Sequence, residues 1–312
     1  MKSMLKLNNK PLMNISFLAD NLKSIILLLR PHQWTKNLLI FMPLFFSANA
    51  TNIPQLKLCF YAFISFSLVA SAIYCINDII DIEDDRKHPE KSKRPVASGH
   101  VTIPTAIVLS ILLLIAGFFS LLISGANTNT VIVVLLYLIF NIAYVFKIKQ
   151  IAIVDVMCIA SGFVIRIVVG GFAAEAALSH WIVLMTFLLA LFLAFAKRRD
   201  DVLHHMQKGI ITRKNIVNYN TDFLNAMLGI TATITIVCYI MYAVDKEVIE
   251  RFNNNQYIYV TSIFVLAAIF RYLQIAMVKE KSGSPTQILW KDKFIQICIA
   301  GWITAFVFII YF

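Results

Sequence analysis

Long apolar stretches constrain the fold of this chain more than any other feature of its sequence. A helix needs about 20 consecutive apolar residues to cross the hydrocarbon core of a bilayer. Helices satisfy all their backbone hydrogen bonds internally, so stretches of this length predict transmembrane helices. The stretches lie at residues 24–47, 55–77, 103–124, 129–147, 151–173, 179–197, 222–244, 256–277 and 292–311. We therefore expect an all-α membrane protein with nine transmembrane helices.

Composition supports this class of protein. Hydrophobic residues make up 59% of the chain and charged residues only 14%, whereas soluble globular domains contain about 25% charged residues. We predict one transmembrane domain over residues 24–312, preceded by a polar N-terminal segment over residues 1–23. The cysteines stand singly in apolar surroundings, so they indicate neither a disulfide framework nor a metal site.

Lysine and arginine are distributed unequally between the predicted loops. Three loops on one side, SANATNIP, SGANTNT and AAEAALS, contain neither residue, and only the segment near Lys246 and Arg251 departs from that pattern. Positive loops remain in the cytoplasm, so we expect a cytoplasmic N-terminus in the cell (inner) membrane, with residues 78–102 on the cytoplasmic side. The formal net charge of +11 then reflects topology and an anionic lipid surface, and we expect no nucleic-acid partner.

One acidic stretch, YCINDIIDIEDDRKHPEKSKRPVASG, begins inside an apolar run at Tyr74 and ends at Gly99. Helical spacing puts Asp78, Asp81 and Asp85 roughly on one face. Carboxylates this close repel one another unless a cation lies among them. Oxygen ligands suit a divalent ion such as Mg²⁺. We therefore predict a metal site formed by Asp78, Asp81 and Asp85, with Asn77 as an additional ligand.

Polar side chains also occur inside the predicted membrane spans, where they tend to face a bundle interior or a wet cavity. The first span contains RPHQWTKN, in which Gln33, Lys36 and Asn37 share a helix face. The fourth span ends in NIAYVFKIK. There the polar positions recur at i, i+3 and i+6, and they are Asn141, Tyr144 and Lys147. These patterns predict a central cavity with polar walls.

The fifth and sixth spans add further charges. Asp155 and Arg166 are eleven residues apart, close to three helical turns, so they share a face. Arg166 lies roughly 22 Å into its helix, where a lone arginine needs a partner. A structural salt bridge within the protein is the alternative to a role in the cavity. Asp155 can instead cap its helix. The sixth span ends in AKRRDD, and its cations, like Lys147 and Lys149, can alternatively be topology charges that reach the interface.

Carboxylates, Mg²⁺ and Lys or Arg side chains together are how proteins hold a diphosphate. The residues therefore predict a diphosphate-bearing substrate at the cytoplasmic mouth of the cavity. A transporter or lipid-binding protein whose acidic stretch binds a cation is the non-enzymatic alternative. Transporters often contain internal repeats, and none is evident in this sequence.

Asn77, Asp78, Asp81 and Asp85 match NDxxDxxxD, and RPVASG follows at residues 94–99. Both resemble the first aspartate-rich motif of the UbiA superfamily of intramembrane prenyltransferases. The resemblance covers nearly the whole chain from Arg30 onward. It implies a UbiA-type bundle of nine helices around a central cavity and a Mg²⁺-dependent transferase.

Four segments look most like one branch of that superfamily, the decaprenyl-phosphate phosphoribosyltransferases. They are RPHQWTKNLL, NDIIDIEDDRKHPEKSKRPVASG, YVFKIKQIAIVDVMCIASGFVIRIVVGG and AKRRDD. Quinone-forming members carry a second DxxxD motif on a later loop. The corresponding loop here is KRRDDVLHHMQKG, in which Asp200 and Asp201 are adjacent, so that motif is absent in its usual form.

The branch implies transfer of 5-phosphoribose from 5-phosphoribosyl 1-diphosphate to a polyprenyl phosphate, such as decaprenyl phosphate, for cell-envelope glycan synthesis. The alternative is a UbiA-type prenyltransferase that moves a prenyl group from a prenyl diphosphate to an aromatic or other acceptor. The predicted catalytic residues are Asp78, Asp81, Asp85 and Lys36. The predicted substrate-binding residues are Gln33, Asn77, Arg94, Asn141, Tyr144, Lys147, Asp155, Arg166, Lys197 and Arg198.

Overall fold

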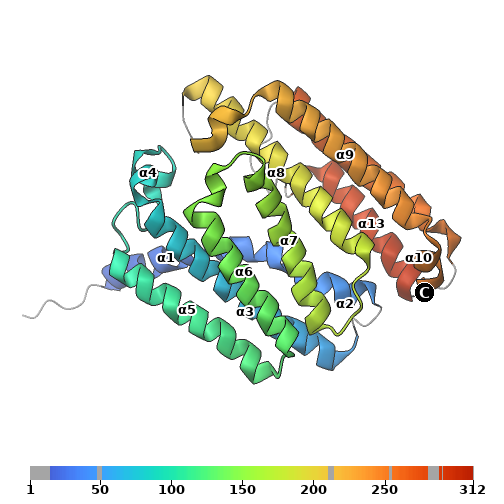
Figure 1. The fold of residues 1–312 in the computed structure, drawn as a ribbon, viewed down its shortest axis with the longest axis horizontal. Coiled ribbons are helices and arrows are strands. Elements are labelled where there is room, and N and C mark those ends of the chain that lie inside the picture. Colours follow the sequence, from blue (N-terminus) through green and yellow to red (C-terminus); the bar gives the residue numbers. More distant parts are fainter. Residues whose placement is uncertain are drawn as a thin grey trace, which may run out of the picture.

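The computed structural model describes residues 15–47, 51–209, 214–252, 255–279, 288–289 and 291–311, and within these ranges all regular secondary structure is helical. Seven helices are long and apolar enough to cross a membrane. They are α3 (Ile53–Ile80), α5 (Ile103–Ser124), α6 (Thr128–Phe146), α7 (Val154–Ala173), α8 (His180–Lys208), α9 (Thr221–Ala243) and the run Gln256–Val278. That run comprises η5 (Gln256–Thr261), α11 (Ser262–Leu273) and η6 (Gln274–Val278), and α13 (Lys293–Tyr311) is a shorter apolar helix beside it. Figure 1 shows the bundle.

The first predicted span differs most from the structure. Residues 24–47 are divided among α1 (Ile15–Leu29), η1 (Pro31–Phe41) and α2 (Met42–Phe46). Arg30 separates α1 from η1 with a left-handed backbone, at φ 52°, and Pro31 cannot supply the N–H that a continuous helix requires. The predicted count of nine uninterrupted spans is therefore not confirmed, and the cytoplasmic N-terminus stays a prediction. Residues 1–14 of the predicted N-terminal segment lie outside the described ranges.

Several helices begin where the sequence supplies a capping side chain. The carbonyl or hydroxyl oxygen of an Asn, Ser or Thr at the N-cap accepts a hydrogen bond from a free amide of the first turn. Such residues precede five of the long helices: Asn52, Thr102, Asn127, Ser179 and Asn220. Gly125 and Gly209 end α5 and α8 in the left-handed conformation, which glycine adopts readily. Local chemistry therefore explains most helix boundaries.

Helix α3 is the central element, because η1, α1, α5, α6 and α7 all contact it. One apolar core joins η1, α3, α6 and α7, and a second joins α8, α9 and α11. Helix α7 contributes Val169 to the first core and Val156 to the second. It thus lies between the two halves of the bundle.

A close approach fixes η1 against α7. A Cβ atom added to Gly170 would lie 2.0 Å from the carbonyl oxygen of Ile40, so only glycine permits this spacing. The contact holds the polar residues of η1 beside those of α7.

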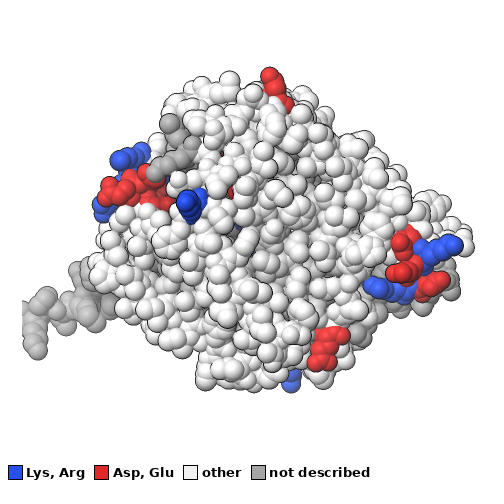
Figure 2. Space-filling model, in the orientation of Figure 1, with Lys and Arg blue, Asp and Glu red and all other residues white. Residues whose placement is uncertain are grey.

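Charged side chains lie at the edges of the molecule. Figure 2 shows most of them over α4 (Ile82–Lys87) on one side and over α10 (Lys246–Arg251) on the other, with a few at the upper and lower margins and a largely uncharged surface between them. Large apolar side chains are exposed along α5 and α6, among them Leu112, Phe119 and Leu136. This distribution is the one expected for a bundle whose middle lies in lipid.

Candidate active site

The acidic stretch occupies the junction of α3 and α4. Asp78 is in the last turn of α3, Asp81 lies between the helices, and Asp85 is in α4. Asp78 and Asp85 are buried, with 1% and 3% of their surfaces exposed. Both accept from the same atom, Nη1 of Arg94, at 3.3 and 2.7 Å.

Asp81 has a different partner. Its Oδ1 lies 2.6 Å from Nζ of Lys149, and the same Nζ is 3.4 Å from Oδ1 of Asn77. Lys149 comes from η3 (Ile148–Gln150), the short turn between α6 and α7. The four residues therefore form two sets: Asp78 with Asp85, and Asn77 with Asp81. The predicted single carboxylate face is wrong, because the chain turns at Asp81 and each set follows its own cation.

Arg30 completes this arrangement and was not predicted as a site residue. Its Nη2 lies 2.5 Å from Oδ1 of Asp78, and its guanidinium carbon is 4.8 Å from the centre of the Tyr74 ring. The left-handed backbone of Arg30 directs this side chain toward α3. The signal in the sequence is the position of Arg30 immediately before Pro31, at the start of the polar segment RPHQWTKN.

The loop after α4 holds Arg94 in place. Pro95, Val96 and Ala97 are buried, and Nε of Arg86 donates to the carbonyl oxygen of Ala97 at 3.2 Å. Val96 packs in a core with Leu28, Ala72 and Cys75. RPVASG thus anchors one guanidinium against two aspartates.

The donor set has the chemistry of a divalent metal site. Carboxylate and amide oxygens are the ligands that Mg²⁺ takes in proteins, and Oδ2 of Asp78 is a buried atom without a hydrogen-bond partner. Across the described ranges, no three His, Cys, Asp or Glu side chains converge with metal-binding geometry. The ion pairs with Arg30, Arg94 and Lys149 account for this, since each carboxylate turns to its cation.

Helix η1 carries polar residues on two faces. A 3₁₀-helix has three residues per turn, so residues i and i+3 eclipse. Trp34 and Asn37 point to α3, where they donate to Ser71 and Ser67 at 3.0 and 2.9 Å. The other pair at this spacing is Gln33 and Lys36. Asn37 therefore lies on a different face of η1 from Gln33 and Lys36, although all three were predicted to share one face.

Lys36 and Arg166 lie near each other in the middle of the molecule. Arg166 is 6% exposed and about 18 Å along α7 from Val154. Its Nε donates to Oδ1 of Asn37 at 2.8 Å, and its Nη1 donates to the carbonyl oxygen of Gly162 at 2.6 Å. Lys36 is within electrostatic range of three further cations: Arg30, Arg166 and Lys197.

Asp155 pairs with Arg198, not with Arg166. Both are fully buried, and Nε of Arg198 lies 2.6 Å from Oδ2 of Asp155. Nη1 of Arg198 also donates to Asp201 at 2.9 Å. The Tyr219 hydroxyl donates to Oδ1 of Asp155 at 2.9 Å and accepts from the amide of Ile153 at 2.6 Å. Arg198 therefore stabilises the junction of α7 and α8. Its Nη2 is buried without a hydrogen-bond partner among the described residues, and its predicted contact with phosphate stays a prediction.

The remaining predicted residues are at the end of α6 and in α8. Asn141 donates to the carbonyl oxygen of Tyr137 at 2.9 Å. Tyr144 is partly buried against the core that contains Phe66. Lys147 and Lys197 are exposed. Of the four, Lys197 lies within electrostatic range of Lys36.

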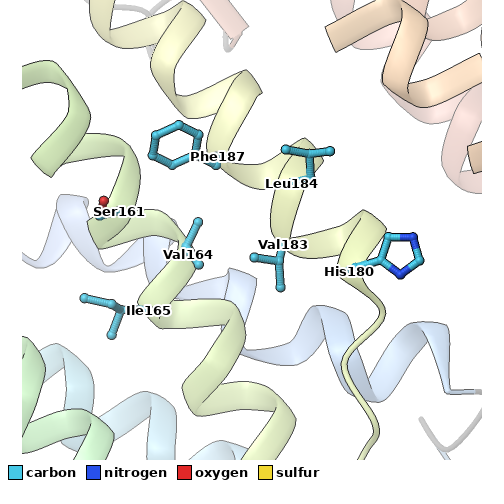
Figure 3. A pocket seen from close by; sticks show the side chains of 7 residues that line it. All are labelled: Ser161, Val164, Ile165, His180, Val183, Leu184 and Phe187. Carbon is cyan, nitrogen blue, oxygen red and sulfur yellow. The ribbon is translucent and has the colours of Figure 1, made fainter. Parts of the chain in front are cut away.

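A groove of about 450 Å³ lies between α7 and α8 (Figure 3). Its lining is apolar except for Ser161 and His180. The predicted site residues are not among those that line it, so the charged cluster does not depend on this groove.

Fold and site together define an integral membrane protein with a cluster of acidic and basic side chains at one end of an apolar helical bundle. The chain belongs to the UbiA prenyltransferase family, whose model matches residues 38–297.

Similar proteins point the same way. A decaprenyl-phosphate phosphoribosyltransferase from Mycolicibacterium smegmatis is 34% identical, over 92% of this chain and 92% of that protein. One from Corynebacterium glutamicum is 29% identical, over 94% of this chain and 88% of that protein. The structure of a UbiA homolog from Archaeoglobus fulgidus bound to GPP and Mg²⁺ has a TM-score of 0.66 at 20% identity, covering 93% of this chain and 100% of that one. The last likeness confirms the all-helical UbiA fold.

Proposed function

We propose that this chain transfers 5-phosphoribose from 5-phosphoribosyl 1-diphosphate to a polyprenyl phosphate, with release of diphosphate, at the cytoplasmic face of the cell membrane. The observation that carries the proposal is the presence of two charged groups in one bundle. One is the acidic motif with its cations Arg30, Arg94 and Lys149. The other is the buried Arg166 with the partly exposed Lys36 near it, and within the described residues neither forms an ion pair with an aspartate of the acidic motif. A sugar donor that carries a 5-phosphate and a 1-diphosphate, together with a phosphate acceptor, requires both.

The acidic motif is the place for the leaving group. Asp78, Asp81, Asp85 and Asn77 would hold Mg²⁺, which neutralises a bound diphosphate and makes it a better leaving group. Arg30, Arg94 and Lys149 now neutralise the carboxylates. When a metal takes over that task, these cations are in position to donate to diphosphate oxygens.

The transfer needs no strong general base. The bond from C1 of the ribose to the diphosphate oxygen breaks, and diphosphate leaves with the electron pair. An oxygen of the polyprenyl phosphate forms the new bond to C1. A phosphate monoester is already anionic near neutral pH, since its second pKa is about 6. The protein contributes by orienting both substrates and stabilising charge. Lys36, Tyr144, Lys147 and Lys197 are the proposed phosphate contacts, and we propose that Gln33 and Asn141 belong to the substrate-binding cavity.

Substrate assays test the proposal directly. Membranes that contain the protein are incubated with labelled 5-phosphoribosyl 1-diphosphate, a polyprenyl phosphate and Mg²⁺, and labelled lipid is extracted. We expect labelled lipid from the wild type and at least a hundredfold less from Asp81→Asn, which keeps the shape of the side chain. EDTA should abolish the reaction. Normal turnover by Asp81→Asn would remove the metal assignment.

The parallel assay uses a prenyl diphosphate and an aromatic acceptor. The relative from Archaeoglobus fulgidus was solved with GPP and Mg²⁺, which makes this the second candidate activity. Product from the prenyl diphosphate alone would replace the proposed function with that of a prenyltransferase.

A further inference from the structure

Arg166 and Arg198 are both buried arginines, but their surroundings differ in charge. Arg198 contacts two carboxylates, Asp155 and Asp201. Arg166 is also buried, with 6% of its surface exposed, but it contacts only neutral groups. The first therefore carries its counter-ions within the protein, and the second does not.

Neutral partners account for all three guanidinium nitrogens of Arg166. Nε donates to the amide oxygen of Asn37, Nη1 to the carbonyl oxygen of Gly162, and Nη2 to the hydroxyl of Tyr137 at 3.4 Å. Three aromatic rings also face the guanidinium, with centroids 4.9 to 5.5 Å from its central carbon: Phe66, Phe163 and Tyr137. Throughout the described part of the chain, no carboxylate lies within ion-pair distance of Arg166.

Lys36 increases this excess of positive charge. It immediately precedes Asn37 in the sequence and lies within electrostatic range of Arg166. Among the described residues Lys36 has no carboxylate at ion-pair distance either. A buried cation without a counter-ion is costly in an apolar bundle. Intramembrane cations often mark substrate pathways, and an anionic ligand would supply the missing negative charge.

The acidic motif cannot supply that charge. Its three aspartates are already paired with Arg30, Arg94 and Lys149. We propose that Lys36 and Arg166 form a separate site for a phosphate monoester dianion, and that Asn37 is the positioning residue that orients Arg166 toward it. The inference rests on the proposed function, which supplies two candidate sources of that dianion. They are the 5-phosphate of the sugar donor and the phosphate of the lipid acceptor.

Asn37 is suited to positioning because it is held from two sides. Its Nδ2 donates to Oγ of Ser67 on α3 at 2.9 Å, and its Oδ1 accepts from Arg166 on α7. Asn37 is 1% exposed and Ser67 is fully buried. A neutral amide fixes the guanidinium without cancelling its charge. An aspartate in the same place would cancel it and remove the reason for a phosphate to bind.

Binding measurements on the full-length protein in nanodiscs test the site without turnover. The probes are ribose 5-phosphate, which lacks the diphosphate, and geranyl phosphate, which lacks the sugar. We expect Asn37→Asp and Lys36→Gln each to lower the affinity of the protein for one of these probes at least tenfold. The same variants should bind Mg²⁺ with inorganic diphosphate within twofold of wild type. The control is Lys57→Gln, which removes an exposed cation near the start of α3 and should change neither affinity.

Each result has a definite meaning. Loss of affinity for ribose 5-phosphate assigns the site to the 5-phosphate of the sugar donor. Loss of affinity for geranyl phosphate assigns it to the phosphate of the lipid acceptor. Unchanged affinity for both probes in Lys36→Gln, which alters a partly exposed side chain, overturns the site. If labelled phosphoribosyl lipid never forms but geranyl phosphate binding still depends on Asn37, the proposed function fails and the phosphate site stands.

Discussion

Arg94 joins Asp78 and Asp85 through one nitrogen, Nη1, which lies 3.3 Å from the first carboxylate and 2.7 Å from the second. The two aspartates are seven residues apart, or about two helical turns. Their side chains are buried, so their mutual repulsion is strong unless a cation separates them. Arg94 therefore stands where a divalent ion would have the same electrostatic effect.

Removing this guanidinium should alter the affinity for a metal ion more than it alters the stability of the fold. In Arg94→Gln the two carboxylates lose a shared cation, and we expect Mn²⁺ to bind the substrate-free protein about tenfold more tightly than wild type. Turnover should fall, because the same guanidinium is proposed to contact diphosphate. Electron paramagnetic resonance of Mn²⁺ measures the affinity. Lys87→Gln, which removes an exposed cation at the end of α4, is the matched control, and equal Mn²⁺ affinity in Arg94→Gln and wild type would contradict the proposed exchange.

The acidic motif and most helices followed from the sequence because local patterns determine them. The predicted stretch 103–124 coincides with α5, and NDxxDxxxD marked the aspartates at the end of α3. Hydropathy could not reveal the break at Arg30, because a window of spanning length averages the polar segment RPHQWTKN with the apolar residues before Arg30 and after Asn37. A left-handed residue is a backbone property that a hydropathy window does not detect.

The partners of the charged residues could not be predicted, because they depend on contacts distant in sequence. Asp81 and its cation Lys149 are 68 residues apart, and Asp155 and Arg198 are 43 apart. The sequence supplied both arginines, Arg166 and Arg198, but not which of them meets a carboxylate. Packing of α7 against α8 and η1 decides that.

The buried pair of Asp155 and Arg198 should be important for stability. Removing one partner of a buried ion pair costs about 3–5 kcal/mol, because the other charge stays uncompensated. We expect Asp155→Asn to lower the midpoint of SDS unfolding strongly. Asp201→Asn should have a smaller effect, since Asp201 is partly exposed and Arg198 retains Asp155. A larger loss in Asp201→Asn than in Asp155→Asn would reverse this order of importance.

Asp292 should stabilise the start of α13 in two ways. It accepts from the amide of Ile295 at 3.1 Å and from Nη2 of Arg271 at 2.8 Å. The Arg271 hydrogen bond holds the pKa of Asp292 below its usual value. A depressed carboxyl pKa gives stability that is present above the unfolded value of about 4 and is lost as the pH falls below it.

Two substitutions separate these contributions. Asp292→Asn keeps the capping oxygen and loses the charge, whereas Asp292→Ala loses both. We expect the thermal midpoint to fall in the order wild type, Asp292→Asn, Asp292→Ala at pH 7. The difference between wild type and Asp292→Asn should shrink as the pH falls below about 4. A difference that is independent of pH would show that the charge of Asp292 contributes nothing.

Gly170 offers a test of how η1 is held beside α7. An added Cβ would meet the backbone of Ile40 at 2.0 Å, and backbone cannot move aside as a flexible side chain can. We expect Gly170→Ala to destabilise the protein by about 1–3 kcal/mol, as overpacking does, and to weaken substrate binding because Asn37 and Lys36 lie on the displaced element. Gly229→Ala in α9 is the control, since its Cβ would meet nothing within 4 Å, and Ala favours a helix by up to about 1 kcal/mol. Unfolding midpoints in SDS and substrate KM values measure both variants. Equal behaviour of the two alanine variants would mean that the contact between η1 and α7 does not position the site.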